Sequence, residues 1–308
     1  MHKKNQYYLM ADIKTFFPSI NKEILYNLIL NHVKSIEELS CEEKNIVLNL
    51  LEKIVFQDPI KPLPVFKGNR KNLSLVPKEK SLFYSSKDVG LPIGSLTSQF
   101  FANIYLNELD QFIKHKLKIK YYIRYVDDFI FIDNTTKNFN KLKKDLSLFL
   151  EKELGLALHP KKFKIQNVSK GIDYLGYIIR PHYILIRKRT ISALKDKLRF
   201  FNWLLDPELY DSNRVKKHFE KNNISKQFRN GDIKKGEEVD LQIIIQMLQT
   251  INSYYGILCK ANSYNLRVSL YEKHFESLKE FFMPKNSFRA FILKPKIVKA
   301  YACRGYLA

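Results

Sequence analysis

Two adjacent aspartates, Asp127 and Asp128, interrupt an apolar, β-rich run that covers residues 121–132. This interruption predicts a β-hairpin whose turn carries both acids, because aspartate favours turns. A second apolar, strand-like segment at residues 7–13 ends near another acid, Asp12. If that strand pairs beside the hairpin, the three carboxylates meet at one edge of a sheet. Taken alone, an Asp-Asp pair is more typical of a solvated turn, and a single strand-end aspartate is equally unspecific.

The chain is strongly basic. Its 308 residues include 53 Lys and Arg against 31 Asp and Glu, which gives a formal net charge of +22. An excess of this size predicts a polyanionic partner, because each phosphate that a cation neutralises releases counterions. The alternative is a generally basic proteome, which the frequent Asn, Lys and Ile would fit. No helix-turn-helix or zinc-finger pattern occurs in the sequence, which argues against generic DNA binding.

Three clustered carboxylates have a specific use in nucleotidyl transfer. That reaction needs two divalent ions about 4 Å apart, one at the attacking hydroxyl and one at the leaving pyrophosphate. Mg²⁺ is a hard ion that prefers carboxylate oxygens. Acids at the ends of adjacent strands offer such oxygens on a rigid support, so the pattern is consistent with a polymerase site.

The apolar periodicity predicts an α/β domain followed by a helical domain, with the boundary near residue 187. Prolines and lysines break the pattern across residues 57–90, which we expect to form a loop or a basic excursion. A polar, charged stretch between residues 206 and 240 interrupts the second domain. Helices are expected at residues 21–33 (with Asn21 as the cap), 41–55, 96–116, 139–154, 190–205, 242–259 and 266–282, and short strands with turns near Gly171 and Pro181 at residues 163–186.

Cys41, Cys259 and Cys303 lie far apart and form neither a disulfide framework nor a paired zinc spacing. A reducing, cytoplasmic location is therefore expected. The polar N-terminus lacks the apolar core of a signal peptide, and no apolar run approaches the roughly 18 residues that span a bilayer. No contact with a membrane is expected.

Five segments occur in the order found in reverse transcriptases. Residues 11–20, ADIKTFFPSI, resemble the first palm motif of that family, and residues 124–129, RYVDDF, resemble its aspartate-pair box. The other segments resemble the template-positioning motif, the lysine motif and the primer grip, and they are GLPIGSLTSQFFANIYL at residues 90–106, LHPKK at 158–162 and YLGY at 174–177. The resemblance implies an α+β fold, with a right-hand polymerase palm (an antiparallel sheet with packed helices) at residues 1–187 and a helical thumb at residues 188–308.

The resemblance also implies an activity. The chain would be an RNA-directed DNA polymerase that uses two Mg²⁺ ions and deoxynucleoside triphosphates to copy a template RNA, and it would hold the resulting RNA–DNA hybrid. Asp12 and Asp127 would bind both ions together with the carbonyl of Ile13, and Asp128 would complete the acidic cluster.

Further residues gain roles from the same resemblance. Lys162 or Lys161 would protonate the leaving pyrophosphate, although both also fit plain exposed lysines. Phe17 would be the aromatic steric gate that excludes a ribose 2′ hydroxyl, and its alternative is a core aromatic. Gly94 would let the backbone approach the base pair closely, and its alternative is an ordinary turn glycine.

Residues 93–99, IGSLTSQ, differ from most members of the family, which carry Gln-Gly before and Ser-Pro after. Ile93 with the Ser98-Gln99 pair resembles the reverse transcriptases of diversity-generating retroelements, which misincorporate opposite template adenines. Isoleucine lacks the hydrogen bonds of glutamine around the nucleotide and template, so geometric checking is expected to loosen. A neutral packing role for Ile93 is the alternative. The subfamily resemblance also implies a small basic accessory variability protein as a partner.

The chain departs from the family pattern at its start. A folded fingers segment normally precedes the first palm motif, whereas Asp12 lies almost at the beginning of this sequence. The fingers are therefore expected to be largely missing apart from residual elements at residues 57–90, and the chain alone is expected to have weak or absent polymerase activity. Two other interpretations stay open: a reverse transcriptase of retron, group II intron or phage-defence type, and a catalytically impaired RNA-binding remnant.

The second domain carries cations and aromatics suited to a nucleic-acid hybrid. Arg187, Lys188 and Arg189 begin it, and the segment 251–256, which contains Tyr254 and Tyr255, is followed by Lys260 and Arg267. Such a surface favours backbone contacts along an RNA–DNA hybrid, which is recognised by shape and phosphate. A helix with one packed and one solvated face explains the same pattern equally well.

Overall fold

A computed structural model describes residues 7–58, 60–61, 74–206 and 240–302. The chain divides into two compact units, Met1–Val168 and Ser169–Ala308. This division lies before the boundary expected near residue 187. The reason is the small sheet at residues 172–186, whose last residue, Ile186, belongs to the core of the second unit. Most of the polar stretch at 206–240, residues 62–73 of the expected loop and Cys303 lie outside the described residues.

The first unit is built on a four-stranded antiparallel sheet with the order β2-β3-β1-β4. Strand β1 pairs with β3 along its whole length, which places Asp12 opposite Asp128. The predicted first strand and the predicted hairpin are both confirmed. The strands are β1 (Tyr7–Asp12), β2 (Tyr122–Tyr125), β3 (Asp128–Asp133) and β4 (Lys164–Asn167).

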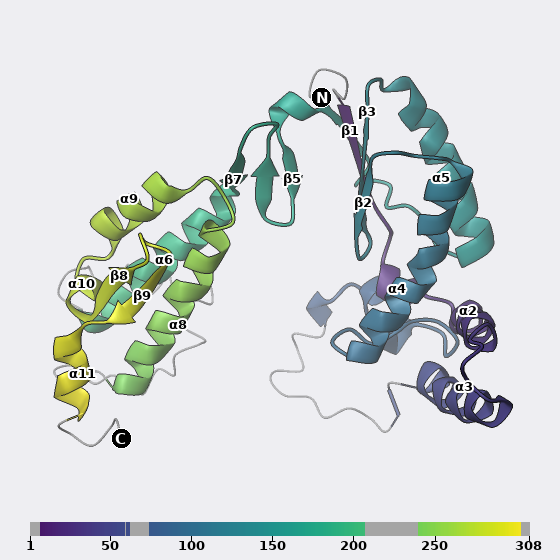
Figure 1. Cartoon of the computed structure of the whole chain (residues 1–308), viewed down its shortest axis with the longest axis horizontal. Helices are drawn as coiled ribbons and strands as arrows, with labels where there is room; N and C mark the ends of the chain where they lie inside the picture. The colour runs from purple at the N-terminus through teal and green to yellow at the C-terminus, as the bar shows by residue number, and fades with distance from the viewer. Residues whose placement is uncertain (1–6, 59, 62–73, 207–239, 303–308) are drawn as a thin grey trace. The chain divides into compact units, whose positions relative to one another are not determined.

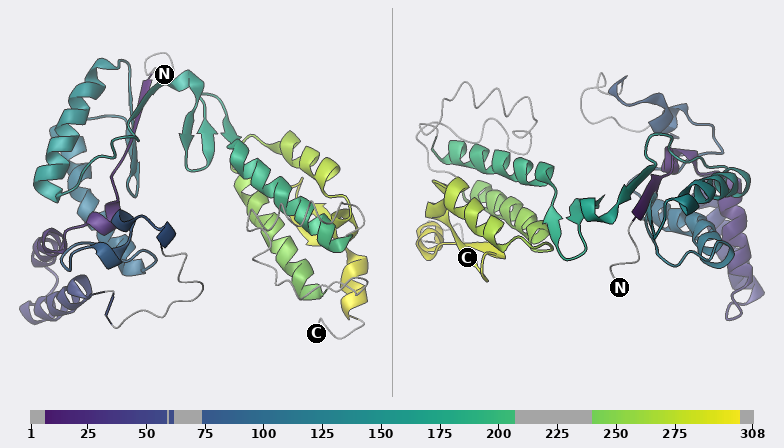
Figure 2. Two further views of the ribbon diagram at one scale, coloured as in Figure 1. Left: turned by 180° about the vertical axis from the view of Figure 1, so that it is seen from behind. Right: turned by 90° about the horizontal axis from the view of Figure 1, so that it is seen from above.

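Helices α4 and α5 lie beside this sheet and share one hydrophobic core with it (Figures 1 and 2). Leu9 of β1 and Phe129 of β3 are buried together with Leu109 of α4 and Leu146 of α5. The helices of this unit are α1 (Phe16–Ser19), α2 (Lys22–Lys34), α3 (Cys41–Phe56), α4 (Leu96–Gln111), its π-helical continuation η4 (Phe112–Lys116) and α5 (Lys137–Leu154), with 3-10 turns η2 (Lys78–Lys80) and η3 (Leu82–Tyr84).

The predicted helices of this unit are confirmed, and their ends follow from local chemistry. The side chain of Asn21 accepts hydrogen bonds from the backbone N–H groups of Glu23 and Ile24, as expected of an N-cap. Ser40 and Glu43 form a capping box at the start of α3. Helix α5 ends at Gly155, which takes a positive φ of 59°.

Backbone hydrogen bonds fix the segment before α4 against α1. The N–H of Gly90 donates to the carbonyl of Ile20 at 2.8 Å, and the N–H of Leu91 donates to the carbonyl of Phe17 at 2.9 Å. A Cβ on Gly90 would lie 3.2 Å from the carbonyl oxygen of Pro18, and φ there is +97°, so glycine meets both requirements. These bonds therefore fix the backbone directly before the loop that contains Ile93 and Gly94.

The second unit combines helices with two small antiparallel sheets. The first sheet has the order β5-β6-β7, and the second pairs β8 with β9. The elements are β5 (Ile172–Tyr174), β6 (Tyr177–Ile179), β7 (Ile184–Ile186), α6 (Lys188–Leu205), α8 (Leu241–Leu258), α9 (Tyr264–His274), α10 (Leu278–Phe281), β8 (Phe282–Lys285), β9 (Ala290–Leu293) and α11 (Pro295–Ala302).

The second unit corrects two expectations. Residues 266–282 do not form one helix, because Glu276 takes a positive φ of 37° between α9 and α10. The unit is also not purely helical, since β8 and β9 form a hairpin after α10. That hairpin is held by long-range contacts: Phe291 stacks on Phe275 with ring centroids 4.7 Å apart, and Arg267 donates to the carbonyl of Phe288 at 2.7 Å. Helical periodicity contains no signal for such contacts.

Within the part of the chain that the structure describes, no helix has both the length and the apolar character needed to cross a membrane.

Candidate active site

Three carboxylates gather at one end of the β1–β3 strand pair. Asp12 is the last residue of β1, and its register partner Asp128 is the first residue of β3. Tyr125 of β2 is also paired with Asp128, so Val126 and Asp127 form the two-residue turn of the hairpin. The structure thus brings Asp12, Asp127 and Asp128 to one edge of the sheet, as the sequence predicted.

Burial and repulsion between neighbouring charges raise the pKa values of Asp127 and Asp128 in this cluster. Asp12 is only 6% exposed. Burial raises the pKa of Asp128 to about 6, and the hydrogen bond and charge of Asp12 and the charge of Asp127 add to this rise. Burial also raises the pKa of Asp127, again with a contribution from Asp12. A positive charge placed beside these acids would therefore stabilise their ionised forms.

Lys162 supplies one positive charge directly. Its ammonium group forms an ion pair with the Oδ2 atom of Asp12. This hydrogen bond raises the pKa of Lys162, and the charges of Asp12, Asp128 and Asp127 contribute further. The lysine therefore stays protonated beside the acids, where a proton donor to a leaving group would be needed.

Backbone hydrogen bonds hold the lysine segment against the end of β1. Ile13 and Leu158 form an antiparallel bridge, and the N–H of His159 donates to the carbonyl of Asp12 at 2.8 Å. The N–H of Lys162 then donates to the carbonyl of His159 at 3.2 Å. Lys161 is exposed, and its backbone N–H lies 3.2 Å from Nδ1 of His159. Of the two lysines, the structure brings Lys162 to the acids.

The chemistry of the three carboxylates suits a hard cation, although their side chains are not arranged around a single metal position. Among residues 7–58, 60–61, 74–206 and 240–302, no group of three or more His, Cys, Asp or Glu side chains is arranged to hold a metal ion. Lys162 occupies the Asp12 carboxylate instead. The donor set still fits Mg²⁺, because neighbouring carboxylates with raised pKa values favour an added positive charge. The predicted metal site stays a prediction.

Phe17 lies in α1, five positions after Asp12. Its side chain is half-buried, packs against the core and contacts Phe16 with ring centroids 5.3 Å apart. Ile13, whose carbonyl was expected to bind metal, is buried beside Leu158. Ile13 directly follows Asp12, whereas Phe17 lies five positions after it, and the gate role of Phe17 stays a prediction.

The predicted template-side residues differ in exposure. Ile93 is 75% exposed, and Gln99 is also exposed. Gly94 takes a φ of +105°, and a Cβ there would meet no atom within 4 Å, so its backbone conformation rather than tight packing favours glycine. Ser98 is 3% exposed and lines a cavity with Lys22, which does not include the three aspartates.

Lys22 was not singled out from the sequence, although it is 2% exposed. Its ammonium group donates to the carbonyl of Gln57 at 3.1 Å. Burial lowers the pKa of Lys22, and the charges of Asp58 and Asp88 oppose this shift. A lysine at the first turn of an amphipathic helix gives no sequence signal for such burial.

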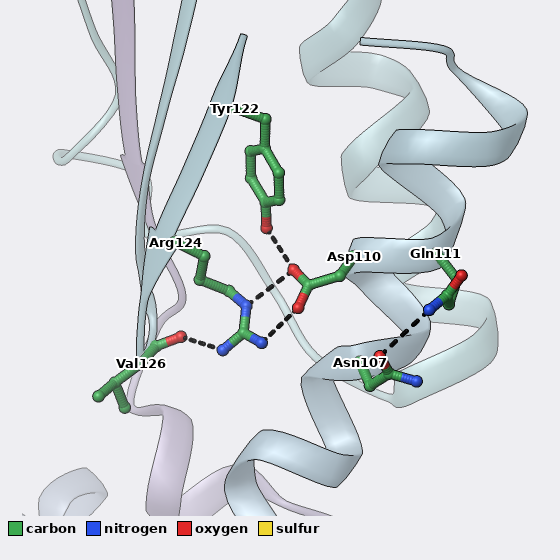
Figure 3. Close-up of polar contacts among 6 residues, drawn as sticks. All are labelled: Asn107, Asp110, Gln111, Tyr122, Arg124 and Val126. Carbon is green, nitrogen blue, oxygen red and sulfur yellow. Dashed lines mark hydrogen bonds and ion pairs between the residues drawn. The ribbon is translucent and has the colours of Figure 1, made fainter. Parts of the chain in front are cut away.

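A polar network behind the hairpin was also missed (Figure 3). Arg124 of β2 donates through Nε to Oδ1 of Asp110 in α4 at 2.8 Å, and its Nη2 contacts Oδ2 of the same carboxylate. Tyr122 donates to the same Oδ1 atom at 2.7 Å, and burial raises the pKa of this tyrosine, so its hydroxyl stays a donor. The Nη1 atom of Arg124 donates to the carbonyl of Val126 at 3.0 Å. Arg124 lies in the quoted RYVDDF motif and Asp110 follows the quoted 90–106 segment by four residues, but only the fold shows that they meet.

The acid cluster makes the stability of the metal-free protein depend on pH. The folded-state pKa of Asp128 is raised from 3.8 to about 6, so the folded chain still holds a proton at pH values at which the unfolded chain has already released it. The free energy of unfolding is therefore expected to fall as the pH rises through that window. Denaturant titrations of metal-free protein at several pH values measure this slope.

Asp128→Asn removes the titrating group and is expected to flatten the slope. Asp133→Asn, at the opposite end of β3, is the matched control and should leave the slope in place. An unchanged slope in Asp128→Asn would contradict the assignment of the raised pKa to this residue.

The chain matches the sequence profile of a known family over residues 1–179, which is more than half of its length. That family is described as reverse transcriptase (RNA-dependent DNA polymerase). A curated relative, the retron Ec73 reverse transcriptase of Escherichia coli, is 29% identical over 210 residues, which cover 66% of this chain and 56% of the relative. The chain thus spans only a little more than half the length of this relative.

Solved structures with some similarity are telomerases. Apo telomerase from Candida tropicalis gives a TM-score of 0.44 at 16% identity, over 82% of this chain and 46% of that one. The same telomerase with a fragment of telomeric RNA gives a TM-score of 0.42 at 16% identity, over 81% of this chain and 42% of that one. These scores are low, and the assignment rests on the sequence match. By that match, the chain belongs to the reverse transcriptase family.

Proposed function

We propose that this chain catalyses RNA-directed DNA synthesis by nucleotidyl transfer. The observation that carries the proposal is the meeting of Asp12, Asp127 and Asp128 at the end of neighbouring strands, within the part that matches the family. In this proposal, residues 1–187 are the palm, with the 57–90 segment as a residual fingers element, and residues 188–308 are the thumb. The substrates are deoxynucleoside triphosphates and a template RNA, and the product is an RNA–DNA hybrid.

The acids hold the metal in this proposal. Asp12 and Asp127 would hold two Mg²⁺ ions together with the carbonyl of Ile13, and Asp128 would complete the negative cluster. When bound, the ions activate the attacking 3′ hydroxyl and stabilise the charge on the leaving pyrophosphate. The support for this set is chemical: partly buried carboxylates with raised pKa values gain from an added cation.

Lys162 acts as the general acid. Its ammonium group lies beside Asp12, and the acids keep it protonated by raising its pKa. It donates its proton to the oxygen of the leaving pyrophosphate as the bond from that oxygen to the α-phosphorus breaks. Lys161, which is exposed on the same segment, is the second candidate for this role.

Primer extension on an RNA template tests the proposal. The purified chain with Mg²⁺ is expected to extend a DNA primer only weakly. Asp127→Ala is expected to lower that rate at least about 100-fold, because lost metal binding removes several kcal/mol of transition-state stabilisation. Asp133→Asn should keep the rate. RNA binding without any extension by the unaltered chain would favour a catalytically impaired RNA-binding remnant and would refute the proposed activity.

Phe17 selects deoxynucleotides in this proposal by clashing with a ribose 2′ hydroxyl. Phe17→Ala is expected to raise the incorporation of ribonucleotides relative to deoxynucleotides roughly 10-fold or more, since one small group in a pocket changes selectivity by about that much. Single-nucleotide incorporation kinetics with both nucleotide types measure the ratio. The melting temperature and the rate with deoxynucleotides serve as controls, and an unchanged ratio with both controls intact would sink the gate role.

The finer proposal is an error-prone enzyme of a diversity-generating retroelement, assisted by a small basic accessory variability protein. It rests on the segment from Ile93 to Gln99, in which Ile93 is 75% exposed and so is free to face a base pair. The alternative is an enzyme of retron type, which the 29% identity to a retron reverse transcriptase favours. A neighbouring template repeat and variable repeat in the DNA would distinguish the two.

Ile93 is expected to set fidelity at template adenines. Ile93→Gln restores a hydrogen-bonding side chain near the nucleotide and is expected to lower adenine misincorporation roughly 10-fold, about the effect of one added hydrogen bond. Sequencing of cDNA made on a defined RNA template measures the errors. Leu148→Gln, at an exposed apolar position on α5, is the matched control. Adenine errors that persist unchanged in Ile93→Gln cDNA would rule this role out.

A further inference from the structure

The turn between β2 and β3 is backbone-strained at its first central residue. Val126 takes a φ of +55°, in the left-handed region, whereas Asp127 is not among the residues with positive φ. Hairpin turns with positive φ at the first central position normally carry glycine there, because a Cβ is unfavourable. A β-branched residue such as valine is a clear exception, so other contacts must hold this conformation.

Arg124 provides a contact at the right atom. Its Nη1 donates to the carbonyl of Val126, which is the peptide group that leads into Asp127. The arginine is itself fixed, since Asp110 accepts hydrogen bonds from its Nε and Nη2 (Figure 3). Its side chain is 11% exposed, and that of Asp110 is 29% exposed, so solvent competes little for these bonds.

The alternation of side chains along β2 explains this geometry. Tyr122 and Arg124 are two residues apart and point to the face that α4 covers, whereas Ile123 and Tyr125 are exposed on the other face. Asp110 accepts from both inward residues, so it connects α4 to the hairpin at two points. The carboxylate thus ties the hairpin to α4.

We propose that Arg124, anchored by Asp110, is a positioning residue for the reaction proposed above. Its guanidinium group holds the carbonyl of Val126 and thereby keeps the strained turn in the conformation that places Asp127 near Asp12. Only an arginine has the planar fork that contacts both oxygens of a carboxylate while a further N–H reaches a second acceptor. The pair therefore shapes the acid cluster without touching substrate or metal.

Hydrogen–deuterium exchange of the metal-free chain tests the clamp without catalysis. Arg124→Met is expected to make the amides of residues 126–128 exchange at least about 10-fold faster, because the turn opens locally. In Arg124→Lys, the exchange rate of these amides should lie between the rates of the unaltered chain and of Arg124→Met. If Arg124→Met folds poorly, Asp110→Asn takes its place, and it should also speed the exchange. Arg199→Met, which removes an exposed arginine that contacts Asp196 on α6, is the matched control and should leave the turn unchanged.

Calorimetric titration with Mg²⁺ gives the second readout. Arg124→Met is expected to weaken Mg²⁺ binding about 10- to 100-fold, as loss of a residue that orients metal ligands commonly does. In primer extension, the Mg²⁺ concentration for half-maximal rate should rise by the same factor. Glycine adopts a positive φ without strain. The double variant Arg124→Met with Val126→Gly should therefore recover most of the Mg²⁺ affinity that Arg124→Met loses, with Val126→Gly alone as the reference.

A purely structural role gives a different pattern. If Arg124→Met lowers the melting temperature but leaves both the exchange of residues 126–128 and the Mg²⁺ affinity unchanged, the proposal is overturned. The proposal is equally overturned if adding Val126→Gly to Arg124→Met restores none of the lost Mg²⁺ affinity. If the unaltered chain binds no Mg²⁺ and extends no primer, the proposed function fails, whereas the exchange comparison still decides whether Arg124 holds the turn.

Discussion

The antiparallel pairing of β1 with β3 is the interaction on which the candidate site depends. Its register sets Asp12 opposite Asp128, and a slip of one residue would turn every side chain of the strand to the opposite face. Register is held by the buried residues of both strands, among them Leu9 and Phe131, which are register partners. The hydrophobic core thus brings together acids that would repel one another if the sheet did not hold them.

That repulsion is relieved within the protein in two ways. The raised pKa of Asp128 lets the cluster keep a proton, and Lys162 places an ammonium group on Asp12. The segment that carries Lys162 hydrogen-bonds to the last peptide of β1, so the lysine and Asp12 share one backbone support. Protonation and ion pairing together offset the cost of placing three neighbouring carboxylates in a buried or partly buried position.

Local periodicity was enough to predict the strands and helices around the site. The run at residues 121–132 with its two acids predicted the hairpin. The meeting of Asp12 with these acids was predicted only on the condition that the strand at residues 7–13 pairs beside the hairpin, and the structure supplies that pairing. The second unit was harder, since Glu276 breaks a run of helical spacing and Phe275 stacks on Phe291 of a hairpin that local pattern does not reveal. Contacts between distant residues also hid the burial of Lys22 and the partnership of Asp110 with Arg124.

The bond network in Figure 3 has a consequence for how the sequence can drift over generations. Asp110 and Arg124 lie on different elements, yet each satisfies the charge that the other buries. Replacing one alone leaves an uncompensated ion beside the core, so the two positions are expected to change together among descendants of this chain. A glycine at position 126 would relieve the strain of the turn, but it would leave this coupling in place, because each charge would still need the other.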